Sequence, residues 1–224
     1  MKVAAYTGTR NLYKGMVAAC KSLLKNSDVD RVYLLIEDDE FPYELPDCVE
    51  TINVSGQTYF RKNSPNMQSS FTYMAMMRAT FALMFPQYDR LLSLDVDTIV
   101  VDDISILWDA PLDGYYFCSS PEWHKTRNGK IYTNIGVCMY NLEKLRDGKA
   151  QEVINELNSI RYPYLEQDVF NFRCQGHILP MNGDYNANAW VRHGDSPKII
   201  HFAGIKDWET KPLVEEYFNM PWTR

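Results

Sequence analysis

Apolar residues in this chain form short continuous runs that alternate with amphipathic segments. The runs at residues 2–7, 31–37 and 90–95 have the length and composition of β-strands. Between the first two runs, apolar residues recur every three or four positions across residues 12–23, which is the spacing of one face of a helix. The first third of the chain therefore predicts strands separated by a helix.

The same alternation continues to about residue 158. Further strands are predicted at 49–54, 115–119 and 136–141, and further helices at 71–85 and over about 16 residues from position 143. Strands separated by helices predict an α/β fold with a largely parallel, Rossmann-like sheet, in which ligands bind beyond the carboxyl ends of the strands. No linker or internal repeat interrupts the pattern, so we expect a single domain over residues 1–224.

Composition narrows the class of function. The net charge of −6 and the absence of a basic stripe argue against nucleic-acid binding, which needs clustered Lys and Arg. No apolar run reaches the length of a membrane span, and the N-terminal apolar segment is too short for a signal peptide. We therefore expect a cytoplasmic protein without a membrane span.

The five cysteines predict a reduced protein. Their number is odd, they form no CxxC pair, and most lie in apolar segments. This distribution favours buried core residues over metal ligands or a catalytic nucleophile.

Two carboxylates one residue apart end the apolar run at 90–95. Side chains two positions apart along a strand point to the same side, so Asp95 and Asp97 can face one cation. Two neighbouring carboxylates repel each other unless a cation or hydrogen-bond donors neutralise them. The alternative interpretation of this segment is an acidic turn after a strand.

A series of motifs in the same order resembles glycosyltransferase family 8, which includes glycogenin and bacterial lipooligosaccharide galactosyltransferases. The motifs are TGTRNLY near the N-terminus, the arginine at 78, LDVD at 94–97, NIGVCMYNL at 134–142, EQDVFN at 166–171, PMNGDYNANAW at 180–190 and IIHFAGIKDW at 199–208. The resemblance implies a GT-A type domain that transfers a hexose from a UDP-sugar with retention of anomeric configuration.

The resemblance also implies a metal site. In the family, both aspartates of LDVD and the histidine of the last motif hold a divalent cation, here Asp95, Asp97 and His201 with Mn²⁺ or Mg²⁺. Carboxylates and one imidazole suit such a cation. Taken without its neighbours, His201 would be read as a core histidine.

By the same resemblance, Gln167 and Asp168 lie at the reacting carbon of the sugar. Their alternative role is to place charge in the first turn of a helix. The donor-binding residues implied by the resemblance are Thr7, Gly8, Tyr13, Arg78, Asp95, Val96, Asp97, Asn134, Gly204 and Lys206.

Two features depart from the family pattern. The last motif has one residue instead of two between Gly204 and Lys206, and Asp207 replaces the usual proline, so Lys206 has a surface role as its alternative. The aspartate that relatives carry between two central strands is missing, which leaves Glu122 as the candidate partner of Arg78.

Other functions stay open at this point. A sugar-phosphate nucleotidyltransferase shares the sheet architecture but needs a glycine-rich N-terminal loop, where this chain has only Gly8. A catalytically inactive UDP-sugar or glycan-binding module is a second alternative. The acceptor is open among a saccharide, a protein and a lipid-linked carrier, because acceptor loops vary, and self-association of the chain is open as well.

Overall fold

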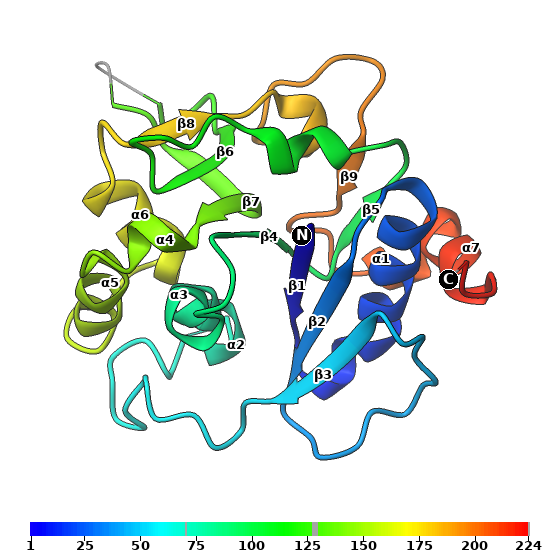
Figure 1. Cartoon of the computed structure of the whole chain (residues 1–224), viewed down its shortest axis with the longest axis horizontal. Helices are drawn as coiled ribbons and strands as arrows, with labels where there is room; N and C mark the ends of the chain where they lie inside the picture. Colours follow the sequence, from blue (N-terminus) through cyan, green and yellow to red (C-terminus); the bar gives the residue numbers. More distant parts are fainter. Residues whose placement is uncertain (70, 127–129, 224) are drawn as a thin grey trace.

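A seven-stranded sheet lies at the centre of the protein. The computed structural model describes residues 1–69, 71–126 and 130–223, and within these the strand order is β3-β2-β1-β4-β7-β6-β8 (Figure 1). The strands are β1 (Val3–Thr7), β2 (Arg31–Ile36), β3 (Val49–Asn53), β4 (Arg90–Leu94), β6 (Phe117–Pro121), β7 (Thr133–Asn141) and β8 (Ile178–Pro180). A small second sheet pairs β5 (Thr98–Val100) with β9 (Ile199–His201).

The sheet is mostly parallel, as predicted, with one reversed strand. β3, β2, β1 and β4 run parallel to one another, and β6 runs parallel to β8, whereas β7 runs antiparallel to both β4 and β6 between them. Leu94 therefore pairs with Val137, and the backbone N–H of Asp95 donates to the carbonyl of Gly136 at 2.7 Å. The beginning of β7 consequently lies beside the carboxyl end of β4.

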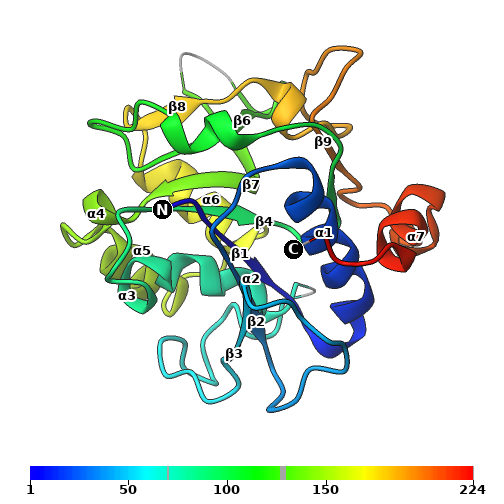
Figure 2. The ribbon, with the colours of Figure 1, turned by 45° about the vertical axis from the view of Figure 1, so that its right-hand side comes forward.

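Helices cover both faces of the sheet. Alternate residues of β1 point to opposite sides, so that Ala4 and Tyr6 belong to one buried cluster, while Val3 and Ala5 belong to the other. The first cluster lies under α1 and α7, and the second under α2 to α6 (Figures 1 and 2). The helices are α1 (Tyr13–Asn26), α2 (Tyr73–Met76), α3 (Phe81–Met84), α4 (Leu142–Leu145), α5 (Lys149–Leu157), α6 (Leu165–Arg173) and α7 (Pro212–Asn219).

The helix predicted over residues 71–85 is present as three short consecutive pieces. A 3₁₀ turn at Met77–Thr80 separates α2 from α3. The hydroxyl of Thr80 donates to the carbonyl of Met77 at 2.7 Å, a local bond that competes with regular helical hydrogen bonding. The spacing of apolar residues therefore predicted which side chains of this segment are buried, but it did not predict that the helix is interrupted by a 3₁₀ turn.

The prediction of one long helix from residue 143 is wrong. The segment forms α4 and α5, and Gly148 between them has φ 112°. This left-handed conformation is strained for residues with a Cβ, so glycine permits the break. Strands β5, β8 and β9 were not predicted either, since each has only three residues.

The cysteines occupy the positions expected of core residues. All five are free, and Cys20, Cys118, Cys138 and Cys174 are buried. In the described part of the chain, no helix has both the length and the apolar character needed to cross a bilayer.

A tryptophan near the C-terminus packs directly onto a glycine of α1. A Cβ on Gly15 would lie 1.9 Å from Cη2 of Trp208, and the backbone N–H of Gly15 donates to a carboxylate oxygen of Glu209 at 3.3 Å. The ring therefore occupies the space where any other residue at position 15 would place its side chain. This contact attaches the segment after β9 to the helix after β1.

Gly15→Ala tests this contact, because the substitution should lower the free energy of unfolding if Trp208 fills the space and raise it if the space is open. In an open helix the substitution stabilises by about 1 kcal/mol, whereas overpacking against Trp208 costs about 1–3 kcal/mol. We expect a net loss in the free energy of unfolding, measured by urea denaturation. Gly56→Ala serves as the control, because a Cβ there meets nothing within 4 Å. A more stable Gly15→Ala protein would contradict the close contact.

Candidate functional site

The three predicted metal ligands meet beside the carboxyl end of β4. Asp95 follows β4, Asp97 precedes β5, and His201 ends β9, whose pairing with β5 places His201 opposite Thr98. The Nε2 atom of His201 lies 3.2 Å from Asp97 and 3.5 Å from Asp95, and one potential ligand atom of each residue lies within 4.8 Å of the others. Two carboxylates and one imidazole form a donor set that fits a divalent cation such as Mn²⁺ or Mg²⁺.

Two asparagines orient the histidine. Nδ1 of His201 lies 2.7 Å from the amide oxygen of Asn186, which in turn accepts from the amide of Asn188 at 3.0 Å. An oxygen acceptor at Nδ1 holds the proton there and leaves Nε2 facing the carboxylates. Both asparagines lie in the motif at 180–190, but the resemblance of that motif to the family did not imply that they orient His201.

Charge attraction dominates the protonation of this cluster. Burial disfavours the charged imidazole, but the carboxylates of Asp97 and Asp95 outweigh it and raise the pKa of His201 above its usual value. Burial likewise opposes ionisation of Asp97, but His201 lowers the pKa of that carboxyl. The cluster is thus arranged to bind positive charge.

Arg78 neutralises the other side of Asp95. Its guanidinium donates to Oδ1 of Asp95 at 2.5 Å and to the carbonyl of Ile135 at 3.2 Å, and it lies 3.6 Å from Glu166. The suggested pairing of Arg78 with Glu122 is therefore wrong. Glu122 instead accepts hydrogen bonds from Asn134 and Gln167, because β6 carries it to the far side of the pocket.

Glu166 is a buried acid that the sequence did not single out. Only 3% of it is exposed, and one of its carboxylate oxygens has no hydrogen-bond partner. Burial raises the pKa of Glu166 to about 7, even though Arg78 pulls it down. It faces Arg78 because α6 begins at Leu165, whose backbone is left-handed with φ 47°.

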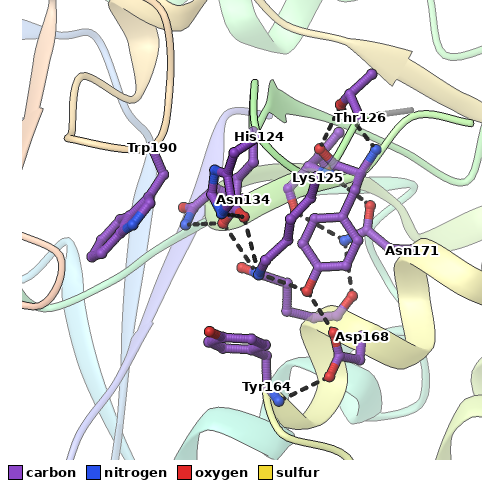
Figure 3. A network of polar contacts seen from close by, with 12 residues as sticks. His124, Lys125, Thr126, Asn134, Tyr164, Asp168, Asn171 and Trp190 are labelled. Atoms are coloured by element: carbon purple, nitrogen blue, oxygen red, sulfur yellow. Dashed lines mark hydrogen bonds and ion pairs between the residues drawn. The ribbon is translucent and has the colours of Figure 1, made fainter.

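A pocket of about 250 Å³ connects these residues. It is lined by Phe71, Asp95, Asp97, Glu122, His124, Lys125, Asn134, Tyr164, Gln167, Trp190, His201, Ala203 and Gly204. Figure 3 shows Trp190, Asn134, Lys125 and Tyr164 around this space. Residues from distant parts of the sequence therefore share one cavity.

Gly136 permits the close packing behind the metal ligands. A Cβ at this position would lie 2.3 Å from Cε1 of His201 and 2.6 Å from a carboxylate oxygen of Asp95. The amide oxygen of Asn134 accepts from the backbone N–H of Gly136 at 3.1 Å and from the amide of Asn186 at 3.0 Å. The beginning of β7 thus supports both the aspartate and the asparagine that orients His201.

Gln167 and Asp168 lie in different surroundings. The amide of Gln167 lines the pocket, where it accepts from the N–H of Ile135 at 3.2 Å and donates to the hydroxyl of Tyr132 at 3.1 Å. Asp168 lines a neighbouring groove, where its two oxygens accept from the hydroxyl of Tyr132 at 2.5 Å and from the N–H of Tyr164 at 2.9 Å. Both positions are close together, but only Gln167 lines the pocket with the metal ligands.

The remaining predicted donor residues lie at the ends of β1 and β4, at the start of α1 and in the last loop. Thr7 is the last residue of β1, and Gly8 follows it. The side chain of Val96 packs close to Gly8, where an added Cβ would lie 3.2 Å from it. Tyr13 is only 3% exposed and its hydroxyl donates to Asp38 at 2.7 Å, so it contributes to packing. Its stacking on a uracil ring stays a prediction.

The loop after β9 carries the last two predicted donor residues, Gly204 and Lys206. Gly204 has φ 74° and borders the pocket, and Lys206 is exposed.

Comparison with known proteins connects this arrangement to one family. The family described as glycosyl transferase family 8 matches residues 3–211. Glycosyltransferase GlyB of Streptococcus pneumoniae is 26% identical over an alignment 179 residues long, and the match covers 70% of this chain and 39% of that protein. General stress protein A of Bacillus subtilis is 24% identical over an alignment 221 residues long, and the match covers 82% of this chain and 70% of that protein. The chain thus spans about two fifths of GlyB.

Solved structures confirm the GT-A fold. The galactosyltransferase LgtC in complex with donor and acceptor sugar analogues superposes with a TM-score of 0.70 at 16% identity, over 97% of this chain and 95% of that chain. The glycosyltransferase GlyE of Streptococcus pneumoniae also has a TM-score of 0.70, at 18% identity, over 99% of this chain and 61% of that chain.

Glu166 predicts a pH-dependent stability. Its pKa rises from 4.5 to about 7 on folding, so the folded state binds more protons than the unfolded state between these values. The contribution of Glu166 to the free energy of unfolding is therefore fully present below pH 4.5, the unfolded pKa, and is lost as the pH rises through about 7, the folded pKa. Glu166→Gln should reduce the loss in unfolding free energy between pH 5 and pH 8 by on the order of 1–3 kcal/mol, measured by urea denaturation in chelator.

The exposed Glu152 provides the control for this measurement. Glu152→Gln should leave the pH profile of unfolding unchanged. An identical profile for Glu166→Gln and the wild-type protein would contradict the raised pKa.

Proposed function

This chain belongs to glycosyl transferase family 8, and from that premise we propose that it transfers a hexose from a UDP-sugar to an acceptor with retention of anomeric configuration. The observation that supports the proposal most strongly is the meeting of Asp95, Asp97 and His201 in a pocket that Gln167 also lines. A complete ligand set favours an active transferase over an inactive binding module.

Asp95, Asp97 and His201 would hold Mn²⁺ or Mg²⁺. The cation supplies Lewis acidity, which neutralises negative charge on the diphosphate of the departing UDP. The protein orients the ligands on their outer sides. Arg78 binds one oxygen of Asp95 and leaves the other facing His201, and Asn186 holds the imidazole from behind.

We place the transferred sugar between the metal ligands and α6. A small cavity of about 100 Å³ beside the main pocket is lined by Arg78, Glu166 and Gln167 among others. Arg78 and Asn134 offer hydrogen-bond donors to sugar hydroxyls and phosphate, and the unpartnered oxygen of Glu166 offers an acceptor. The end of β1, with Thr7 and Gly8, together with Val96 and Tyr13, is the proposed uridine side, and Gly204 and Lys206 are proposed to lie near the diphosphate.

Gln167 supports attack on the same face of the sugar from which UDP departs. An amide is a poor nucleophile, and both ends of the Gln167 amide already have hydrogen-bond partners. In this route the acceptor oxygen bonds to the sugar carbon, the bond from that carbon to the phosphate oxygen breaks, and the hydroxyl proton passes to the diphosphate. The amide oxygen of Gln167 stabilises positive charge on the sugar.

Asp168 is better suited to positioning than to bonding the sugar. Both of its oxygens accept hydrogen bonds, from Tyr132 and from the backbone of Tyr164. With both oxygens already engaged, Asp168 is a poor candidate for a covalent bond to the sugar. We therefore propose that Asp168 holds Tyr132 against Gln167.

The cytoplasmic location and the self-association of the chain stay predictions.

The metal assignment is tested by UDP binding. Mn²⁺ should raise the affinity for UDP by about tenfold or more, because Asp95, Asp97 and His201 share one cation. Asp95→Asn should abolish that gain in calorimetry, and Asp113→Asn, an exposed control, should preserve it. Tight UDP binding in chelator that Asp95→Asn does not change would contradict the assignment.

The role of Gln167 is tested by turnover. Gln167→Ala should lower the rate of donor hydrolysis by about 100-fold with little change in UDP affinity, because the amide acts mainly when charge develops. Asp168→Asn should have a smaller effect, since the residue acts through Tyr132. Unchanged hydrolysis in Gln167→Ala would refute the assignment, and an inverted linkage in a transfer product, seen by NMR, would refute retention.

A further inference from the structure

A second cavity adjoins the proposed donor pocket. This groove has a volume of about 650 Å³, and His124, Lys125 and Tyr164 line both cavities. Its other walls include Tyr132, Arg161 and Phe172. The groove is therefore continuous with the place where we put the transferred sugar.

Aromatic rings form much of the groove surface. Tyr164 is 47% exposed and Phe172 is 54% exposed, and both line the same groove, where grouped exposed rings are typical of a binding surface. Tyr132 lies near Phe172, with ring centroids 6.3 Å apart. Such rings offer flat apolar surfaces to the C–H faces of a sugar.

The charge exposed in the groove is positive, although the whole chain carries −6. Arg161 is exposed, and within the described residues it has no ion-pair partner. The ammonium of Lys125 lies 3.7 Å from the ring centroid of Tyr164. An unpaired guanidinium presents paired donors that match phosphate or carboxylate oxygens.

The acidic groups nearby do not cancel this charge at the surface. Asp168 is 5% exposed, and its oxygens are bonded to Tyr132 and to the backbone of Tyr164. Glu122 is 3% exposed and lies 3.1 Å from the ammonium of Lys125. A ligand in the groove therefore meets Arg161 rather than these carboxylates.

One tyrosine connects the groove to the reacting residue. The hydroxyl of Tyr132 bonds to both Gln167 and Asp168, and its ring lines the groove. Gln167 lines the adjoining pocket, which shares His124, Lys125 and Tyr164 with the groove, so the groove opens beside the residue near which an attacking hydroxyl is needed.

We propose that this groove binds the acceptor, and that the acceptor is a saccharide carrying a phosphate or carboxylate group that Arg161 recognises. The assignment rests on the proposed transferase function, because that function defines Gln167 as the reacting end. The aromatic wall binds the sugar ring, and the guanidinium selects the anionic member of otherwise similar sugars.

The test compares neutral and anionic sugars with the donor site filled by UDP and Mn²⁺. The probe pairs are methyl glucoside with methyl glucuronide, and glucose with glucose 6-phosphate, measured by ligand-observed NMR titration. The anionic member of at least one pair should bind about tenfold more tightly, and salt should reduce the difference. The pair that shows the preference identifies the recognised group as carboxylate or phosphate.

Variants locate the preference in the groove. Arg161→Ala should abolish it, Arg161→Lys should retain part of it, and Phe172→Ala should weaken binding of both members of a pair. Arg192→Ala is the matched control, because Arg192 is also exposed but lines a different cavity. Equal binding of neutral and anionic sugars, or a preference that survives Arg161→Ala, would overturn the proposal.

The two proposals fail in different ways. If the wild-type protein does not bind UDP with Mn²⁺, the transferase proposal is lost, and the acceptor role of the groove is lost with it. If UDP binds as expected and the anionic preference is missing, only the assignment of the acceptor class is overturned.

Discussion

The balance of charge around Asp95 is the constraint on which the rest of the site depends. Asp95, Asp97 and Glu166 are acids in a region largely closed to water, where unpaired charges are costly. Arg78 binds Asp95 from one side, and His201 faces both aspartates from the other. The acids attract these two cations strongly enough to raise the pKa values of Arg78 and His201 despite burial. The protein alone therefore compensates much of the charge, and a divalent cation bound by all three residues would take the place of the proton on Nε2 of His201.

The reversed strand β7 makes this balance possible. An antiparallel neighbour brings its first residues to the carboxyl end of β4, which a parallel strand in the same place would not do. Gly136 then lies against Asp95 without a side chain in the way, and Asn134 connects to the asparagine behind His201. Sheet direction and site chemistry are thus linked through the first few residues of one strand.

The sequence predicted what depends on local pattern and missed what depends on packing. β1, β2 and β4 are largely apolar runs of five or six residues, long enough to recognise, whereas β9 has only three residues and is defined by its pairing with β5. The three candidate metal-ligating residues were selected from their motifs, and the structure brings them together. Glu166 was missed because nothing in EQDVFN shows that a left-handed Leu165 turns residue 166 toward Arg78. The same limitation led to the wrong partner for Arg78, since that choice depends on where β6 and α6 lie in space.

The contact between Trp208 and Gly15 has a consequence for the loop 202–207, which carries Gly204 and Lys206. One end of this loop is held by β9, with the N–H of Phe202 bonded to the carbonyl of Asp97, and the other end is held by the tryptophan on α1. Ordering a free residue costs about 1–2 kcal/mol of conformational entropy. Because both ends are already tied down and the segment is short, little disorder remains to be lost when a ligand arrives. A ligand that contacted this loop would therefore spend little of the contact free energy on ordering it.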